Sequence, residues 1–205
     1  GMEAEPLFAI MRHCHELRRV EQNGQTVWQG DPMEAALLES APLDGKLFPR
    51  IDEIPFDTER KRMSVICDTP QGYMLYCKGA PESVLPLCSE MLLQGKCLPL
   101  DEASRTSLLS AHEQMTERGL RVLALAYRNL PEHTAAEQRE TGLIFAGLVG
   151  LVDPPREAVP DAIRVCQAAG IRVIMVTGDH PHTASALARE IGLAQNPVAV
   201  TGDKL

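Results

Sequence analysis

The segment 55–64 combines an aromatic side chain with a run of positive charge. Phe56 precedes Arg60, Lys61 and Arg62, in a chain that holds only four phenylalanines, three tyrosines and one tryptophan. A purine base packs well against a flat apolar ring, and phosphates need cations nearby. These residues therefore suit a nucleotide, although a buried Phe56 beside a solvated basic turn would also explain them.

Two further stretches have residue types that suit a phosphate group. Lys78 ends an apolar run and precedes Gly79, whose backbone can approach a ligand closely because it has no Cβ. Thr177, Gly178 and Asp179 follow another apolar run and precede a helical pattern, so backbone amides at that helix start would face an anion. An exposed lysine in a strand–helix turn, and a capped turn without a ligand, are the simpler interpretations.

Three other charged residues are candidates for nucleotide binding only when they are considered together with the residues above. Arg121 opens an apolar run, and Asp153 and Arg156 flank a pair of prolines. A surface arginine at a strand end and a plain linker would explain them as well. The sequence contains neither G-x-x-x-x-G-K-[ST] nor G-x-G-x-x-G, so any nucleotide site must be built in another way.

The elements before residue 150 follow a mixed pattern of helices and strands. Asp31 can cap a helix that has Pro32 in its first turn, and Glu34 completes a capping-box-like pattern. The continuous apolar run 143–152 suggests a strand that is buried on both faces. The spacing predicts helices over 7–17, 31–41, 101–118 and a short one from 80, and strands over 25–29, 47–54, 63–67, 73–77, 120–126 and 143–152, with a hairpin at 69–72.

The pattern changes at the paired prolines. Helices over 159–169 and 183–191 enclose a predicted buried strand over 171–176, which is an α/β arrangement. We therefore expect two domains, residues 3–150 and residues 151–205.

Composition excludes several classes of function. Lys and Arg number 20 and Asp and Glu 28, so the net charge of −8 argues against a nucleic-acid binder. The longest apolar stretch, ten residues, is shorter than the roughly 20 that a membrane span needs. The six cysteines form no Cys-x-x-Cys pair, which indicates reduced and mostly buried thiols. His13, Cys14 and His15 could suggest a metal, but neighbours in a helix point in different directions.

Six motifs follow one another along the chain: GDPxE, PFxxxRKxMSV, CKGAPE, LRVLALA, GLVDPPR and VTGDHxxTA. This series resembles the cytoplasmic loop of P-type cation-transporting ATPases, in particular the calcium-pump-like branch. The resemblance implies an α+β nucleotide-binding domain, with an antiparallel twisted sheet flanked by helices. A partial α/β, Rossmann-like segment of the haloacid-dehalogenase-like phosphorylation domain would follow it.

The resemblance also implies a role for each matching residue in the first domain. Phe56 would stack on adenine, and Glu34 would hydrogen-bond near the adenine amine. Lys61 and Lys78 would line the path from the base to the phosphates, and Gly79 would allow close approach of the base.

The later matches would serve the phosphate end of the nucleotide. Arg121 would reach the β-phosphate, and Asp153 and Arg156 would lie at the hinge near the ribose and phosphates. Thr177, Gly178 and Asp179 would meet the γ-phosphate end when the two domains close.

Other family motifs do not occur in this chain. DKTGT, which carries the phosphorylated aspartate, is missing, and so are GDGxND, which helps to hold Mg²⁺, and the TGE actuator motif. We therefore expect a cytoplasmic domain of an integral membrane pump that binds ATP, as Mg-ATP in the parent protein, without holding Mg²⁺ or turning ATP over by itself. Its partners would be adenine nucleotide and the phosphorylation, actuator and transmembrane domains, with no nucleic acid.

Two departures from the family leave alternatives open. Met33 lies where the family often has Thr, and Thr58 lies where calcium pumps often have Arg. Both could weaken nucleotide contacts, which would fit a non-catalytic interaction or regulatory module of the same fold. A small phosphatase of the haloacid-dehalogenase class is a third hypothesis, and the missing DxD or DxT nucleophile argues against it.

Overall fold

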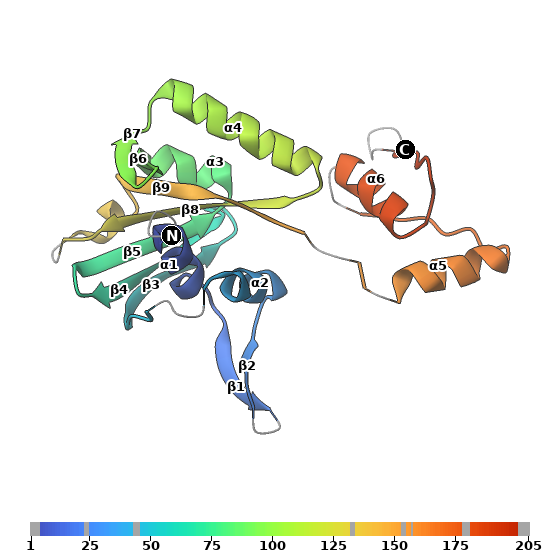
Figure 1. The fold of residues 1–205 in the computed structure, drawn as a ribbon, viewed down its shortest axis with the longest axis horizontal. Coiled ribbons are helices and arrows are strands. Elements are labelled where there is room, and N and C mark those ends of the chain that lie inside the picture. The colour runs from blue at the N-terminus through green and yellow to red at the C-terminus, as the bar shows by residue number, and fades with distance from the viewer. Residues whose placement is uncertain are drawn as a thin grey trace. The chain divides into compact units, whose positions relative to one another are not determined.

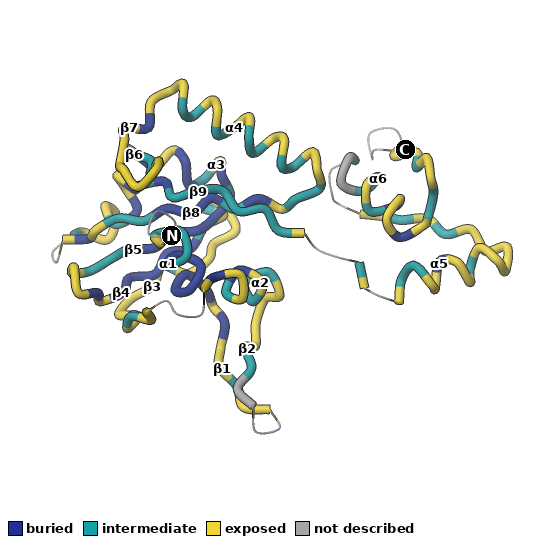
Figure 2. The backbone as a smooth tube through the Cα atoms, in the orientation of Figure 1, coloured by how far each residue is buried: buried dark blue, intermediate teal, exposed yellow. Residues whose placement is uncertain are grey.

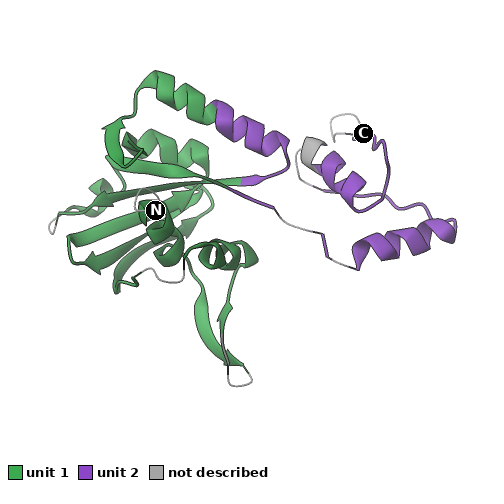
Figure 3. Cartoon of the chain, in the orientation of Figure 1, with its two compact units in different colours: residues 1–109, 122–149 green, residues 110–121, 150–205 purple. Residues whose placement is uncertain are grey.

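The chain forms two compact units in a computed structural model that describes residues 5–22, 25–42, 46–131, 134–152, 155–156, 158–177 and 181–200. The first unit comprises residues 1–109 and 122–149, and the second comprises residues 110–121 and 150–205 (Figure 3). Each unit is considered by itself.

A seven-stranded sheet forms the centre of the first unit (Figure 1). Its pairs β3–β4, β4–β5, β5–β8 and β6–β7 are antiparallel, whereas β6 and β9 are parallel. The expected α+β class with a mostly antiparallel sheet is therefore confirmed. In spatial order the strands are β3 (Arg50–Asp57), β4 (Arg62–Thr69), β5 (Gly72–Gly79), β8 (Arg121–Asn129), β9 (Leu143–Leu151), β6 (Cys88–Leu93) and β7 (Lys96–Pro99).

Most of the helices match the sequence pattern. The side chain of Asp31 caps α2, since its Oδ1 accepts hydrogen bonds from the amides of Met33 at 2.8 Å and Glu34 at 3.4 Å. Gly119, with φ of +82°, follows α4 as expected of a residue that ends a helix. The helices are α1 (Glu5–His13), α2 (Pro32–Ser40), α3 (Pro81–Val84), α4 (Glu102–Glu117), α5 (Val159–Ala168) and α6 (Pro181–Glu190), with short 3-10 turns at Leu85–Leu87 and Ala136–Gln138.

The two faces of the sheet carry different helices because side chains alternate along each strand. Tyr76 in β5 stacks on His13 of α1, with ring centroids 5.3 Å apart, and Lys78 contacts α2 on the same face. The opposite face carries the main apolar core. Figure 2 shows long buried stretches in β4, β5 and β8, and a further one in α1. This core comprises Ile66, Leu75, Cys77, Val84, Leu85, Cys88, Leu100, Ala124, Ala126, Leu130, Leu143 and Phe145.

The β-structure differs from the expectation in two respects. The sequence pattern did not indicate β1 (Arg18–Gln22), β6 or β7; β1 forms an antiparallel hairpin with β2 (Gln25–Gln29). The strand β9 is not buried on both faces: only Leu143 and Phe145 are buried, and the rest are half-buried. The core covers one face of β9, whereas α1 covers the other only in part, through Leu7 against Gly147.

The second unit does not form the expected strand. Residues 171–177 form neither helix nor strand, and Ile174 and Val176 are 76% and 93% exposed. A parallel strand needs hydrogen-bonded neighbours on its edges, and the described residues supply none here. The Rossmann-like arrangement is therefore not confirmed. The helices α5 and α6 are present, and the side chain of Gln167 donates to the carbonyl of Leu193 at 3.1 Å.

Candidate functional site

Three strand ends meet at one edge of the sheet. Arg62, the first residue of β4, pairs with Asp57 at the end of β3 and with Gly79 at the end of β5. The turn 58–61 and the residues after Gly79 therefore lie beside each other. Four of the predicted site residues, Phe56, Lys61, Lys78 and Gly79, lie at this edge.

Phe56 is an exposed aromatic side chain at an irregular point of β3. Ile54 pairs with Ser64 and Asp57 with Arg62, so Pro55 and Phe56 together oppose the single residue Met63. Phe56 is 53% exposed, which excludes the interpretation that it is a core residue. Met63 pairs with Lys78, so Phe56 and Lys78 belong to the same face of the sheet.

Lys78 is buried rather than exposed, and its ammonium group forms an ion pair with Glu34 of α2. The other carboxylate oxygen of Glu34 accepts a hydrogen bond from the amide of Glu16 at 2.9 Å. Glu34 therefore does not complete a capping box, because both oxygens bind partners outside the start of α2. A buried ammonium group needs such a carboxylate, because an unpaired charge would be costly to remove from water.

Lys61 lies in the turn between β3 and β4. Its φ of +50° is in the left-handed region, and its Nζ is 3.2 Å from Glu82 Oε1. Both side chains are more than half exposed, so this ion pair is worth little and can exchange for a ligand.

Gly79 has a structural role at the same edge. A Cβ at this position would come closer than 3.0 Å to Arg62 Cβ and to the carbonyl oxygen of Lys61. The amide of Ala80 donates to that carbonyl at 2.9 Å. Absence of a side chain thus allows the turn before β4 to pack directly on the end of β5.

The sequence pattern missed the acidic residue at this edge. Glu140 is buried, and its carboxylate accepts hydrogen bonds from Arg60 at 2.8 Å, Arg62 at 3.0 Å and Ser64 at 2.7 Å. Glu140 is separated from these residues by 76 to 80 positions. A carboxylate just before the apolar strand β9, and the basic run 60–62, were the only signals in the sequence.

The remaining predicted residues belong to the second unit. Arg121 begins β8 and is exposed, and Arg156 and Thr177 are exposed in the second unit. Asp153, Gly178 and Asp179 lie outside the described residues.

The His13–His15 segment is built into the first unit. The Nε2 of His13 accepts the amide of Phe48 at 2.9 Å, and its Nδ1 lies 2.8 Å from the Ala9 carbonyl oxygen. Burial raises the pKa of the Cys14 thiol, whose sulfur is 3.7 Å from the Met63 carbonyl oxygen. Within the described part of the chain, no cluster of three His, Cys, Asp or Glu side chains could hold a metal ion.

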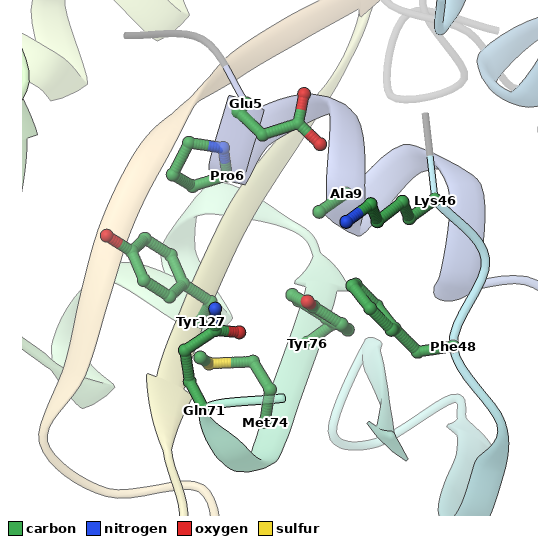
Figure 4. A pocket seen from close by; sticks show the side chains of 9 residues that line it. All are labelled: Glu5, Pro6, Ala9, Lys46, Phe48, Gln71, Met74, Tyr76 and Tyr127. Carbon is green, nitrogen blue, oxygen red and sulfur yellow. The ribbon is translucent and has the colours of Figure 1, made fainter. Parts of the chain in front are cut away.

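A separate pocket of about 480 Å³ lies toward the other end of β5 (Figure 4). None of the predicted nucleotide residues lines it. Its walls come from α1, from the segment before β3, from the turn between β4 and β5, and from β5 and β8. The lining residues are Glu5, Pro6, Ala9, Lys46, Phe48, Gln71, Met74, Tyr76 and Tyr127.

The fold and the comparisons with known proteins agree on the class. Residues 5–158 match the family described as P-type ATPase, cytoplasmic domain N. The chain therefore belongs to the P-type ATPases and contains their N domain. No helix in the described ranges has the length and apolar character needed to cross a membrane.

Individual relatives are transport ATPases from distant organisms. The chain is 41% identical over 175 residues to calcium-transporting ATPase 1 of Bacillus cereus, covering 82% of this chain and 20% of that protein. It is 43% identical over 157 residues to the sodium/potassium-transporting ATPase subunit alpha-4 of Rattus norvegicus, covering 71% and 15%. It is 42% identical over 159 residues to the endoplasmic reticulum-type calcium-transporting ATPase 3 of Arabidopsis thaliana, covering 76% and 16%. The chain thus spans a fifth or less of these relatives.

Proposed function

We propose that this chain is the part of a P-type pump that binds adenine nucleotide, with the base against Phe56 and the phosphates toward Lys61. The observation that carries this proposal is the exposed Phe56 on the same sheet face and edge as the Lys78–Glu34 ion pair. An aromatic ring, an ammonium group and a carboxylate acceptor in one place can meet a base and its exocyclic amine.

Glu34 and Lys78 would recognise the base rather than the phosphates. The adenine amine is a donor, and Glu34 supplies acceptor oxygens at the edge of the site. Lys78 is already neutralised by Glu34, so it would orient that carboxylate while its stem lies along the base. Gly79 would let the turn that carries Lys61 lie close to the end of β5, and Lys61 would exchange Glu82 for phosphate oxygens.

In the whole pump, we propose that ATP bound here donates its terminal phosphate to an aspartate outside residues 1–205, which drives cation transport across a membrane. Mg²⁺ would arrive with ATP, since the described side chains at this edge are mainly cations and paired carboxylates. Arg121, Asp153 and Arg156 would serve the phosphates and the hinge. Thr177, Gly178 and Asp179 would approach the γ-phosphate, and this chain alone would not hydrolyse ATP.

A titration tests the proposal. We expect ATP, ADP and AMP to shift the NMR signals of 56–61 and 78–79 with a Kd of roughly 0.1–10 mM, and GTP to bind more weakly. Phe56→Ala should abolish these shifts without changing the folded spectrum, because the side chain packs on little else. Lack of any adenine-nucleotide shift at 10 mM would contradict the proposal.

A second function has one observation in its favour. The cations at this edge pair with carboxylates: Lys61 with Glu82, Lys78 with Glu34, and both Arg60 and Arg62 with Glu140. Such pairing reduces the attraction for phosphates and would suit a regulatory or interaction module. Met33, half-buried in α2, and Thr58, exposed in the turn, would add to this weakening. A melting temperature that no nucleotide changes would favour this alternative.

A further inference from the structure

A chain of hydrogen bonds links the buried Glu140 to the backbone beside Phe56. Glu140 Oε2 accepts from Arg60 Nη1 at 2.8 Å, and Arg60 Nη2 donates to the carbonyl oxygen of Pro55 at 2.8 Å. Pro55 directly precedes Phe56 in the irregular stretch of β3. Two hydrogen bonds therefore connect a buried carboxylate with the peptide that carries the aromatic ring.

A second branch of the same network holds the turn that follows. Arg62 Nε donates to Glu140 at 3.0 Å, and Arg62 Nη1 donates to the Arg60 carbonyl at 3.4 Å. The hydroxyl of Ser83 donates to that same carbonyl. Ser64 donates to Glu140 Oε1 at 2.7 Å, which fixes the orientation of the carboxylate.

The pairing register of β3, β4 and β5 shows that the basic residues 60–62 have two different roles. Arg62 and Ser64 lie on the sheet face of the main core, together with Glu140, whereas Phe56 belongs to the face of Met63 and Lys78. Arg60 and Arg62 both form ion pairs with the buried Glu140. Of the three basic residues, Lys61 is therefore the one that can bind a ligand's phosphates.

We propose that Glu140 is a positioning residue for the adenine site, acting through Arg60 on Pro55 and so on the orientation of Phe56. This rests on the proposed function, because it assumes that Phe56 receives the base. An exposed ring has little packing of its own to hold it, so its backbone must be held instead. Pre-organisation of this kind lowers the entropy lost on binding.

The chain offers a matched control for Glu140. Its sequence neighbour Arg139 pairs with Asp52 of β3 at 2.6 Å, which ties the same segment to the same strand without reaching Pro55. Asp52→Asn and Glu140→Gln each replace one carboxylate with an amide. A general loosening of the segment would affect both variants, whereas positioning of Phe56 would affect only Glu140→Gln.

The test combines hydrogen exchange without ligand and AMP titration, both by NMR. For Glu140→Gln we expect amide exchange at 57–62 to rise by roughly tenfold and AMP affinity to fall by about three- to tenfold. Asp52→Asn should change neither by more than about twofold. Affinity for tripolyphosphate, which has no base, should change little in both variants.

A second variant decides the question if Glu140→Gln does not fold. Arg60→Met removes the link between Glu140 and Pro55 but keeps the hydrogen bonds of Arg62 and Ser64 to Glu140. We expect the same faster exchange and weaker AMP binding. Unchanged exchange and AMP affinity in folded Glu140→Gln, or in Arg60→Met, would overturn the positioning role while leaving the proposed function intact. A wild type that binds no AMP would instead overturn the proposed function and, with it, the role of Glu140 in binding.

Discussion

Two apolar segments of this molecule differ in burial: the strand β4 is buried, whereas side chains of residues 171–177 are exposed. In β4, Val65 and Ile66 are 0% and 3% exposed, whereas Ile174 and Val176 in the second unit are 76% and 93% exposed. The strand β4 has β3 on one side and β5 on the other, and residues 171–177 have no strand beside them within the described ranges. An apolar run thus becomes a buried strand only where neighbours satisfy its backbone and cover its side chains.

Truncation of one apolar side chain in the sheet and one in residues 171–177 gives the largest expected difference. Leu75→Ala removes a fully buried side chain of β5 and should cost about 2–5 kcal/mol. Ile174→Ala should change stability by less than about 0.5 kcal/mol. Urea unfolding followed by fluorescence of Trp28, the single tryptophan, reports on the first unit, and circular dichroism reports on the whole chain. Equal losses in both variants would show that 171–177 is as well packed as the sheet.

The Lys78–Glu34 ion pair should give the next largest effect. Glu34→Gln leaves a buried ammonium group without its carboxylate and should destabilise the first unit by about 3 kcal/mol. Adding Lys78→Met removes the stranded charge and should restore most of this loss. If the double variant is no more stable than Glu34→Gln in urea unfolding, the cost does not come from the unpaired lysine.

Glycines in the two units should respond differently to a methyl group. Gly79→Ala would force Arg62 and the Lys61 carbonyl to move, at a cost of about 1–3 kcal/mol. Gly170→Ala, after α5, meets no atom within 4 Å and should cost only about 1 kcal/mol through its φ of +73°. Melting temperatures of the two variants measure the difference, and a larger loss for Gly170→Ala would contradict it.

Acid should weaken the first unit through its buried histidines. Burial lowers the pKa of His15 to about 4, and it also lowers that of His13. The unfolded chain binds these protons near pH 6.5 and the folded chain only at lower pH, so stability is complete above pH 6.5 and falls below it. Between pH 6.5 and 4.5 we expect a loss of about 1–3 kcal/mol, measured by Trp28 fluorescence in urea. His13→Gln should reduce this slope, and an unchanged slope would exclude His13 as a source.

The local features of the fold could be predicted because each depends on a few adjacent residues. Asp31 caps α2 through amides two and three positions away, and the β4–β5 hairpin closes at Thr69 and Gly72 as expected. Phe56 and Lys78 were recognisable as candidates by their types and spacing. The short strands β6 and β7 were harder to predict from the sequence, because buried and exposed residues do not alternate regularly along them.

The sequence by itself determined which residues could serve a nucleotide and which short stretches could form helices and strands. Only the tertiary structure decided that Lys78 is buried on Glu34, 44 residues away, and that Glu140 gathers Arg60, Arg62 and Ser64. It also decided that Ile174 and Val176 remain exposed. The physical reason is the same in each case. Charges and strands pair with whichever distant segments lie beside them, and residue types and periodicity along the chain do not show which segments these are.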